Sequence, residues 1–234
     1  MKKVVTCLFF LVSVLISAQQ KPLIVKLKKI DHLKVYNGLN VNLIKSNEQK
    51  IEIFGERASE IEIREKKGTV KISLDLLNTF NHQKLVINLY YKSNIADLSA
   101  FQGAVIRSKE IFKQTQLSMS AQEGAYVKLT LEVDYLKVKG ITGGHFQLKG
   151  NTKSQDVSIV SGASYEAFYL ESDLATMYVS TGSSAEIKAN KALDAKAKFG
   201  GTIVYAGGPK SVNISQSMGG KISKALVEKV AVAQ

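Results

Sequence analysis

Four aspartates recur at a similar place in the second half of the sequence. Each follows a glycine by 10 to 12 residues, and the pairs are Gly124 and Asp134, Gly144 and Asp156, Gly162 and Asp173, and Gly182 and Asp194. If these glycines mark equivalent corners of a repeat, the aspartates lie at the opposite corner in one row. A row of carboxylates could bind cations or sugar hydroxyls. The structural alternative is that each aspartate forms a turn by hydrogen-bonding its own backbone.

Aromatic residues form a second candidate site between residues 160 and 189. Tyr165 and Tyr169 have the same parity in an alternating pattern, so we expect them on one face, with Phe168 on the other. Exposed tyrosines stack on sugar rings and anchor interfaces. Tyr165 and Tyr169 are therefore candidate ligand-binding residues, like the four aspartates. The alternative is that they pack in the core or against another subunit.

Signals of catalysis are weak. The histidines are His32, His82 and His145, no G-x-S-x-G motif occurs, and no pair of histidines has metal-ligand spacing. His145 follows two glycines, which is typical of a polar turn residue. The calcium-binding loop and the nonapeptide glycine–aspartate repeat are missing as well. We expect no catalytic residue, no metal site and no cofactor.

Regular glycine spacing indicates the fold that would position the candidate residues. Seven turn glycines are separated by 21, 20, 18, 20, 19 and 19 residues, and they are Gly103, Gly124, Gly144, Gly162, Gly182, Gly201 and Gly220. Each period holds two short alternating runs, which suit half-buried strands. Two strands and two turns make one flattened coil, and coils stack at about 4.8 Å.

The sequence therefore predicts an all-β fold, a parallel β-solenoid (β-helix) of two-strand coils of about 19–20 residues. The regular coils are expected over residues 98–225. Residues 19–97 are less regular, and we expect an N-terminal β region of the same solenoid, built from wider coils or hairpins. A two-sheet sandwich is the alternative fold, because regularly spaced short strands suit it too.

The N-terminus has the layout of a secretory signal peptide. Lys2 and Lys3 precede an apolar run over residues 4–16, and small residues follow at Ser17 and Ala18. We expect a signal peptide over residues 1–18, too short for a membrane span, with an uncleaved anchor as the alternative. The single cysteine, Cys7, lies within it, so the mature chain would make no disulfide. Residues 226–234 are expected to form a C-terminal tail without an evident anchor.

The formal net charge of +12 raises the question of an anionic partner. Only Arg57, Arg64 and Arg107 are arginines, and arginine is the residue that reads phosphates and bases by bidentate contacts. The lysines are spread along the chain and mostly alternate with apolar residues, which indicates solvated strand faces. Attraction to an anionic surface, such as acidic glycan or lipopolysaccharide, is the alternative. We expect no nucleic-acid partner.

Four stretches resemble the head GIN domain family, the "putative auto-transporter adhesin" family of exported proteins in Bacteroidetes-type bacteria. They are LKVYNGLNVNLIKSNEQKIEIFGE (33–56), EIEIREKKGTVKISL (60–74), SGASYEAFYLESDLATMYVSTGSSAEIKA (161–189) and YAGGPKSVNISQSMGGKISKA (205–225). The resemblance covers nearly all of the mature chain, although the turns depart from a strict Gly-Ser-Gly. It implies a right-handed β-helix similar in shape to pectin lyases and hexapeptide-type acyltransferases. It also implies adhesion, assembly as a trimer and no shared catalytic residues.

Together these features predict an exported, non-catalytic β-solenoid that acts in adhesion or as an envelope-associated binding module. Its expected partner is a glycan, the cell envelope or a host surface, and homo-oligomers are expected. The protein would lie in the periplasm, on the outer surface or outside the cell, with no membrane span after signal removal. One alternative is a polysaccharide lyase or hydrolase on a pectin-lyase-like β-helix. Another is a purely structural envelope protein.

Overall fold

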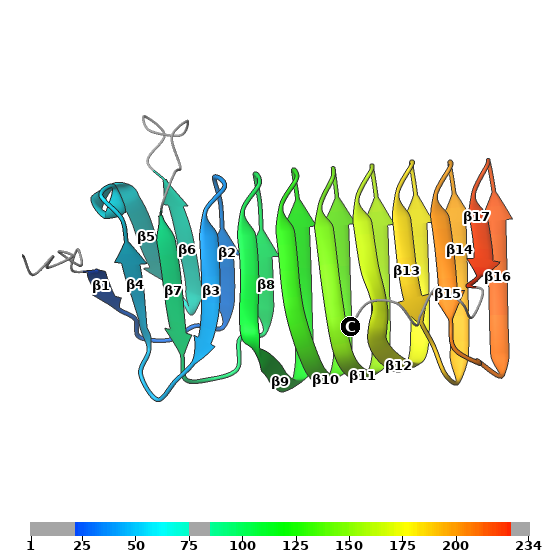
Figure 1. Ribbon diagram of the computed structural model, residues 1–234, viewed down its shortest axis with the longest axis horizontal. Helices are drawn as coiled ribbons and strands as arrows, with labels where there is room; N and C mark the ends of the chain where they lie inside the picture. The colour runs from blue at the N-terminus through cyan, green and yellow to red at the C-terminus, as the bar shows by residue number, and fades with distance from the viewer. Residues whose placement is uncertain (1–21, 75–84, 226–234) are drawn as a thin grey trace, which may run out of the picture.

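The structure is a computed structural model that describes residues 22–74 and 85–225, and Figure 1 shows them as one elongated stack of strands. The expected signal peptide and C-terminal tail lie outside the described residues. The described strands join in one sheet that winds around a common core. One 3-10 turn, η1 (Ala58–Glu60), is the only helical element described. Within residues 22–74 and 85–225, no helix has the length and apolar character that crossing a membrane requires.

The regular part of the stack is a parallel β-solenoid. Its four longest strands each run around the corner opposite the glycines without a break, and they are β9 (Val105–Gln122), β10 (Tyr126–Ile141), β11 (His145–Val160) and β12 (Ser164–Ser180). In the later coils this strand is divided in two, giving β13 (Ser184–Lys188), β14 (Ala192–Lys198), β15 (Thr202–Ala206), β16 (Ser211–Ser217) and β17 (Lys221–Lys224). The predicted β-solenoid is confirmed, with about seven turns of about 19 residues.

Every second side chain of a coil points inward and stacks on its equivalent in the next coil. One such column runs in register through Ile106, Val127, Phe146, Tyr165, Ala185 and Ile203. All six side chains are at most 2% exposed. Full burial of a large apolar side chain contributes about 1.5–3 kcal/mol. The alternation seen in the sequence is thus the stacking of one continuous core.

The glycine corners are two-residue turns in which both residues have positive φ. At Ser161 and Gly162, for example, φ is 59° and 73°. This is the type I′ geometry, whose second position suits glycine. The Gly162 N–H donates to the carbonyl oxygen of Thr181 in the next coil (3.0 Å), and the equivalent bond recurs from Gly38 to Gly200. The corners therefore form a hydrogen-bonded seam along the stack.

Three of the predicted corner glycines are displaced by one residue. The residues with positive φ are Gly143, Gly200 and Gly219, and the glycine that follows each of them has a different role. A Cβ atom on Gly144 would lie 2.1 Å from the carbonyl oxygen of Ala121. The same close approach to backbone oxygens recurs at Gly201 and Gly220. The first glycine of each pair is favoured by its positive φ. The second is required because a side chain there would collide with backbone oxygens.

The N-terminal region is a mixed sheet whose order in space differs from its order in sequence. The coil of β2 (His32–Val35) and β3 (Asn40–Lys45) lies between two later coils. On one side lie β6 (Thr69–Leu74) and β7 (Val86–Tyr91), and on the other lie β8 (Asp97–Ala100) and the start of β9. All of these neighbours pair in parallel with it. Coils thus begin well before residue 98.

Antiparallel strands cover the outer side of this region. β4 (Lys50–Phe54) pairs with β7, β1 (Leu23–Lys26) pairs with β4, and β5 (Ile61–Lys66) forms a hairpin with β6. Both forms expected for residues 19–97, coils and hairpins, therefore occur together. These strands close the N-terminal end of the core, where Ile51 and Ile53 are fully buried.

The two glycine roles predict different costs of adding a methyl group. Gly124→Ala keeps open space around Cβ but forces alanine into the left-handed region, which costs about 1–2 kcal/mol. Gly144→Ala requires no left-handed backbone but must displace the Ala121 carbonyl, and because this group is backbone its loss of stability is larger. Urea unfolding of both variants measures the difference. Gly124→Asn is the control, because asparagine tolerates positive φ and recovers part of the loss. Equal losses at Gly124 and Gly144 would contradict this division of roles.

Candidate functional site

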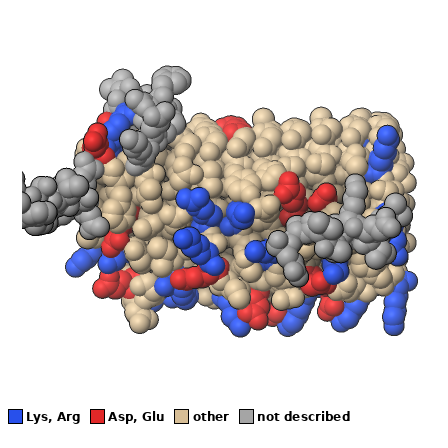
Figure 2. Space-filling model, in the orientation of Figure 1, with Lys and Arg blue, Asp and Glu red and all other residues tan. Residues whose placement is uncertain are grey.

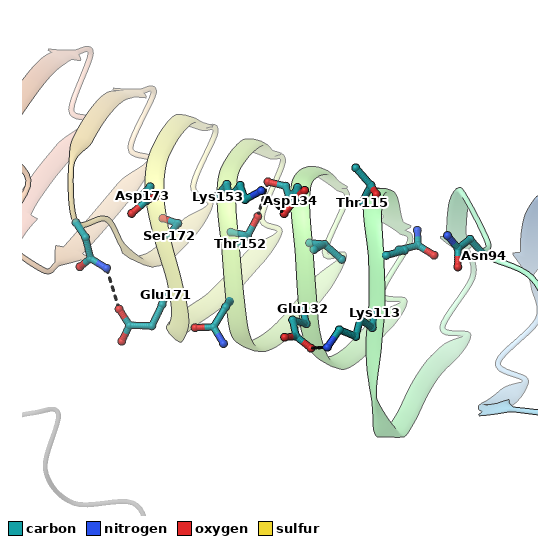
Figure 3. A pocket seen from close by; sticks show the side chains of 14 residues that line it. Asn94, Lys113, Thr115, Glu132, Asp134, Thr152, Lys153, Glu171, Ser172 and Asp173 are labelled. Carbon is teal, nitrogen blue, oxygen red and sulfur yellow. Dashed lines mark hydrogen bonds and ion pairs between the residues drawn. The ribbon is translucent and has the colours of Figure 1, made fainter.

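A polar groove runs across the coils at the corner opposite the glycines (Figure 3). Its volume is about 580 Å³, and side chains from β9, β10, β11 and β12 line it. On one side, Lys113, Glu132, Asn151 and Glu171 follow one another in register. On the other side, Asp134, Lys153 and Asp173 come from successive coils. Carboxylates in both rows are interrupted by lysine or asparagine. Figure 2 shows that basic and acidic side chains are also interspersed along the lower side of the stack.

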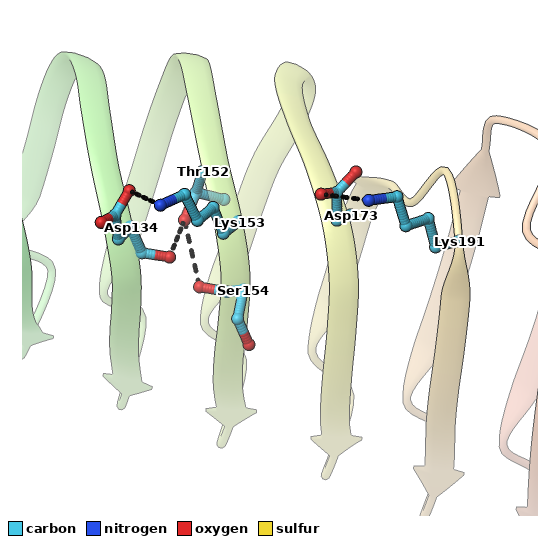
Figure 4. Close-up of polar contacts among 6 residues, drawn as sticks. All are labelled: Asp134, Thr152, Lys153, Ser154, Asp173 and Lys191. Carbon is cyan, nitrogen blue, oxygen red and sulfur yellow. Dashed lines mark hydrogen bonds and ion pairs between the residues drawn. The ribbon is translucent and has the colours of Figure 1, made fainter.

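Ion pairs between neighbouring coils neutralise the carboxylates of this groove. Lys153 Nζ lies 3.0 Å from Asp134 Oδ1, and Lys191 Nζ lies 2.9 Å from Asp173 Oδ2 (Figure 4). The single hydroxyl proton of Thr152 is shared between the carbonyl oxygens of Asp134 (3.2 Å) and Ser154 (3.0 Å), which both accept from it (Figure 4). The side chains are partly exposed, so each pair contributes about 0–1 kcal/mol. Their main effect is to remove repulsion between stacked coils.

Carboxylates of the opposite row are also paired with side chains of neighbouring coils. Lys113 Nζ lies 2.6 Å from Glu132 Oε2, and Glu171 binds both Lys188 (2.5 Å) and Asn190 (3.0 Å). Burial acts to raise the pKa of Glu171, but the hydrogen bonds from Asn190 and Lys188 outweigh it and lower that pKa. The carboxylate is thus held in its charged form, bound to protein groups.

The single row predicted for the four aspartates does not form. Asp134 and Asp173 lie in the polar groove, whereas Asp156 and Asp194 lie on an exposed strand face beyond it. There, Asp156 and Asp194 flank Thr176 in register. Similar distances from the corner glycine did not mean the same register: Asp156 follows its true corner, Gly143, by 13 residues and pairs with Lys137, three residues beyond Asp134. Binding of sugar hydroxyls by these four residues stays a prediction.

A second groove, here called the aromatic groove, has a volume of about 860 Å³. The residues that line it include Lys109, Lys128, Gln147, Lys149, Phe168 and Tyr169. Tyr169 is 51% exposed, and Phe168 is half-buried beside it. The groove crosses β9 to β12 where their register shifts. It therefore arises from an irregularity in otherwise uniform coils.

A β-bulge separates the two candidate tyrosines. Gln147 pairs with Glu166 and Lys149 pairs with Tyr169, so β12 has one more residue than β11 in this interval. An extra residue reverses the alternation of side chains beyond it. Tyr169 therefore faces outward although Tyr165 faces inward. The prediction that they share a face was wrong for this reason.

Tyr165 belongs to the core. Its side chain is 1% exposed, and its hydroxyl donates to Gln155 Oε1 at 2.7 Å. Gln155 Nε2 donates to Ser172 Oγ (2.8 Å), which donates to the carbonyl oxygen of Lys188 (2.5 Å). Burial raises the pKa of the Tyr165 hydroxyl. Tyr165 is thus a core-packing residue, which is the alternative that the sequence left open.

Three lysines of the aromatic groove have no carboxylate partner within the described part of the chain. Lys109, Lys128 and Lys149 are exposed and come from successive coils, and none of them forms an ion pair with a described residue. Gln147 lies among them, accepting from the Tyr126 hydroxyl (2.9 Å) and donating to Glu166 (3.3 Å). The groove joins an exposed aromatic ring to three lysines without ion-pair partners among the described residues, and Glu166 and Glu186 line it as well.

His145 lies in a cluster that the sequence reading missed. Its Nδ1 hydrogen-bonds Ser164 Oγ, its Nε2 lies 3.5 Å from Glu166 Oε1, and the Tyr126 ring stacks on it at 4.8 Å. The sequence contained a signal for this contact: His145 and Ser164 each lie two residues after the corner glycine of their coil, so they occupy equivalent positions in adjacent coils. Serine, histidine and a carboxylate are the residue types of acyl-transfer triads, which also need donors for an oxyanion. The Ser164 N–H donates to the carbonyl oxygen of Gly144 (2.9 Å), so it is engaged in the ladder.

The different environments of the tyrosines predict different effects on stability. Tyr165→Phe leaves the buried Gln155 without its donor and costs about 1–3 kcal/mol. Tyr165→Ala also opens a cavity and costs about 3–5 kcal/mol. Tyr169→Ala removes an exposed side chain and changes the free energy of unfolding by less than about 0.5 kcal/mol. Chemical denaturation of the three variants measures these values, and a large loss at Tyr169 would contradict the assignment.

The ion pairs also predict the response to calcium. Asp134 and Asp173 each already have an ammonium partner, and no described residues form a group of three or more histidine, cysteine or acidic side chains that could hold a metal ion. Millimolar Ca²⁺ or a chelator should leave the melting temperature unchanged in differential scanning calorimetry. A rise that depends on Ca²⁺ and disappears in Asp173→Asn would show that the aspartates bind cations after all.

Solved structures of similar shape come from Bacteroides and Parabacteroides species. An adhesin of Bacteroides fragilis NCTC 9343, described as putative, is 18% identical with a TM-score of 0.80, over 87% of this chain and 96% of that one. A putative adhesin of Parabacteroides distasonis ATCC 8503 is 19% identical with a TM-score of 0.70, over 87% and 96%. A protein from the same strain described as a putative lipid binding protein is 16% identical with a TM-score of 0.67, over 88% and 98%. At these identities the likeness shows the fold alone.

A family model identifies the protein family of this chain, which the likeness to solved structures does not. No curated protein matches this chain. The model described as "Putative auto-transporter adhesin, head GIN domain" matches residues 30–209, which span most of the described coils and the whole aromatic groove. The resemblance seen in the sequence is thereby confirmed: the chain belongs to the head GIN domain family.

Proposed function

We propose that this protein is an exported, non-catalytic adhesion module that binds an anionic polysaccharide through the aromatic groove. Membership of an auto-transporter adhesin family supports export and adhesion. One observation carries the choice of ligand: the exposed ring of Tyr169 shares a groove with three lysines that lack acidic partners among the described residues.

The order of the side chains suits a chain-like ligand. Lys149 on β11 pairs in register with Tyr169 on β12, one strand spacing of about 4.8 Å away. Lys128 on β10 is diagonal to Lys149, because it lies two residues along the strand from Thr130, the partner of Lys149, so a polymer laid obliquely across the coils meets all three. The Tyr169 ring offers an apolar face for a sugar ring, and the ammonium groups pair with carboxylate, sulfate or phosphate substituents. Gln147 adds amide hydrogen-bonding capacity between them.

Binding rather than cleavage suits the carboxylates best. A glycosidase needs an acid and a second carboxylate converging on one bond, and a lyase needs a base at proton-transfer distance. In the polar groove, Glu132, Asp134 and Asp173 are each ion-paired with lysine, and Glu171 is held in its charged form. In the aromatic groove, Glu166 contacts Gln147 and His145. These contacts favour a structural role for the acidic residues.

Binding to polygalacturonate, with neutral dextran as the comparison polymer, tests this function. The wild-type chain should bind polygalacturonate and not dextran, and the affinity should fall as salt rises, because exposed charges are screened. Tyr169→Ala and Lys149→Glu should each weaken binding by about tenfold, which corresponds to the loss of about 1.4 kcal/mol. Isothermal calorimetry or a biolayer measurement gives these values.

Matched controls come from the same solenoid. Tyr135→Ala removes a tyrosine that is 55% exposed outside the groove, and Lys137→Glu reverses an exposed charge on a different strand face. Both should bind like the wild type. If the control variants lose as much affinity as the groove variants, the effect of the groove substitutions comes from net charge or exposed surface and not from a specific site. Release of new sugar ends would favour the polysaccharide-acting enzyme, and no binding to any acidic polymer would favour a purely structural envelope protein.

A further inference from the structure

The C-terminal end of the solenoid leaves part of the core uncovered. β16 pairs with β14 on one side, and no described strand pairs with its other side. Val212 and Ile214 are in register with Leu193 and Ala195, which are 2% and 0% exposed, yet they are themselves 43% and 40% exposed. Figure 1 shows β16 and β17 at the end of the stack. Core positions of the last coil thus lack the next coil.

The outer edge of β16 carries no charge. Its seven residues read SVNISQS, without lysine, acidic residue or proline, whereas β14 reads ALDAKAK and β17 reads KISK. Soluble proteins usually guard edge strands with charges or cover them. At the opposite end, β1, β4 and β5 cover the core with antiparallel strands. An uncharged, seven-residue edge is therefore an exception within this molecule.

We propose that β16 pairs antiparallel with β16 of a second copy, about a two-fold axis at Ile214. In this register Val212 lies opposite Gln216, Asn213 lies opposite Ser215, and Ile214 meets its own copy. The strand contains no like-charged pair that this arrangement would bring together. The pairing supplies backbone partners to the free edge and covers Val212 and Ile214. It is isologous and closed, so two chains complete it.

The size and charge of the end face set the strength of this contact. The last coil, residues 211–224, supplies 14 residues per chain, against about 20–30 in a standard interface. Lys210, Lys221 and Lys224 are exposed at this end, and neither β16 nor β17 carries an acidic residue. Association is therefore concentration-dependent and strengthens as salt screens the lysines. This salt response is opposite to that of polysaccharide binding.

Sedimentation equilibrium of the purified chain over a concentration series tests the proposal. The wild-type mass should rise from one chain to two and should rise further toward two in higher salt. Ile214→Lys places two ammonium groups at the axis and should keep the mass at one chain. Ser215→Lys adds a charge to the same edge from an exposed position and should do the same without touching the core. Far-UV circular dichroism establishes that both variants are folded.

Ile111→Lys is the matched control, because Ile111 is 58% exposed on β9, far along the stack, and the substitution is the same. This variant and Tyr169→Ala should both dimerise like the wild type, which separates this contact from the polysaccharide site. A single-chain mass at every concentration, a mass of three chains, or dimers in Ile214→Lys would overturn the proposal. So would a chain that dimerises only after residues 226–234 are removed, because the tail would then be the occupant of the edge.

Discussion

The parallel backbone ladder between coils is the interaction on which the rest of the structure depends. In the regular coils each strand receives its hydrogen bonds from a segment about 19 residues away, and the corner seam from Gly38 to Gly200 holds the same register at the edge of the stack. Because register is shared, every side-chain column is set at once. The apolar column through Phe146 and the ion pairs through Asp134 are two results of the same alignment.

Uniform stacking also explains why the two grooves differ. In the polar groove, unlike charges from adjacent coils meet and satisfy one another, so the repeat produces a stable and electrically neutral surface. The aromatic groove forms where a bulge interrupts the repeat and turns Tyr169 outward beside Lys149. Bulges often re-aim a side chain near functional sites. A repeat protein can gain a specific site in this way without losing its core.

The fold was largely readable from the sequence, and the site was not. Alternation and glycine spacing depend on local geometry, so they indicated coils of the correct length. Their failures were errors of register: Asp156 lies three residues beyond the register of Asp134, and a one-residue bulge separates Tyr165 from Tyr169. Each error reverses or shifts a whole set of side chains, which is why the aspartate row and the tyrosine pair were wrong although the fold was right. The insertion of β2 and β3 between later coils depends on long-range pairing that no local pattern reveals.

That insertion has a consequence for the order in which the chain can fold. In the regular coils, contacts form between residues about 19 apart, as between His145 and Ser164, whereas Asn42 and Arg107 are 65 apart. Closing the longer loop costs about 1 kcal/mol more in chain entropy. The β2–β3 coil also has to wait until β8 and β9 have emerged, because they form one of its two sides. We therefore expect this N-terminal coil to be among the last parts to acquire their native partners, and folding to begin in the later, local coils.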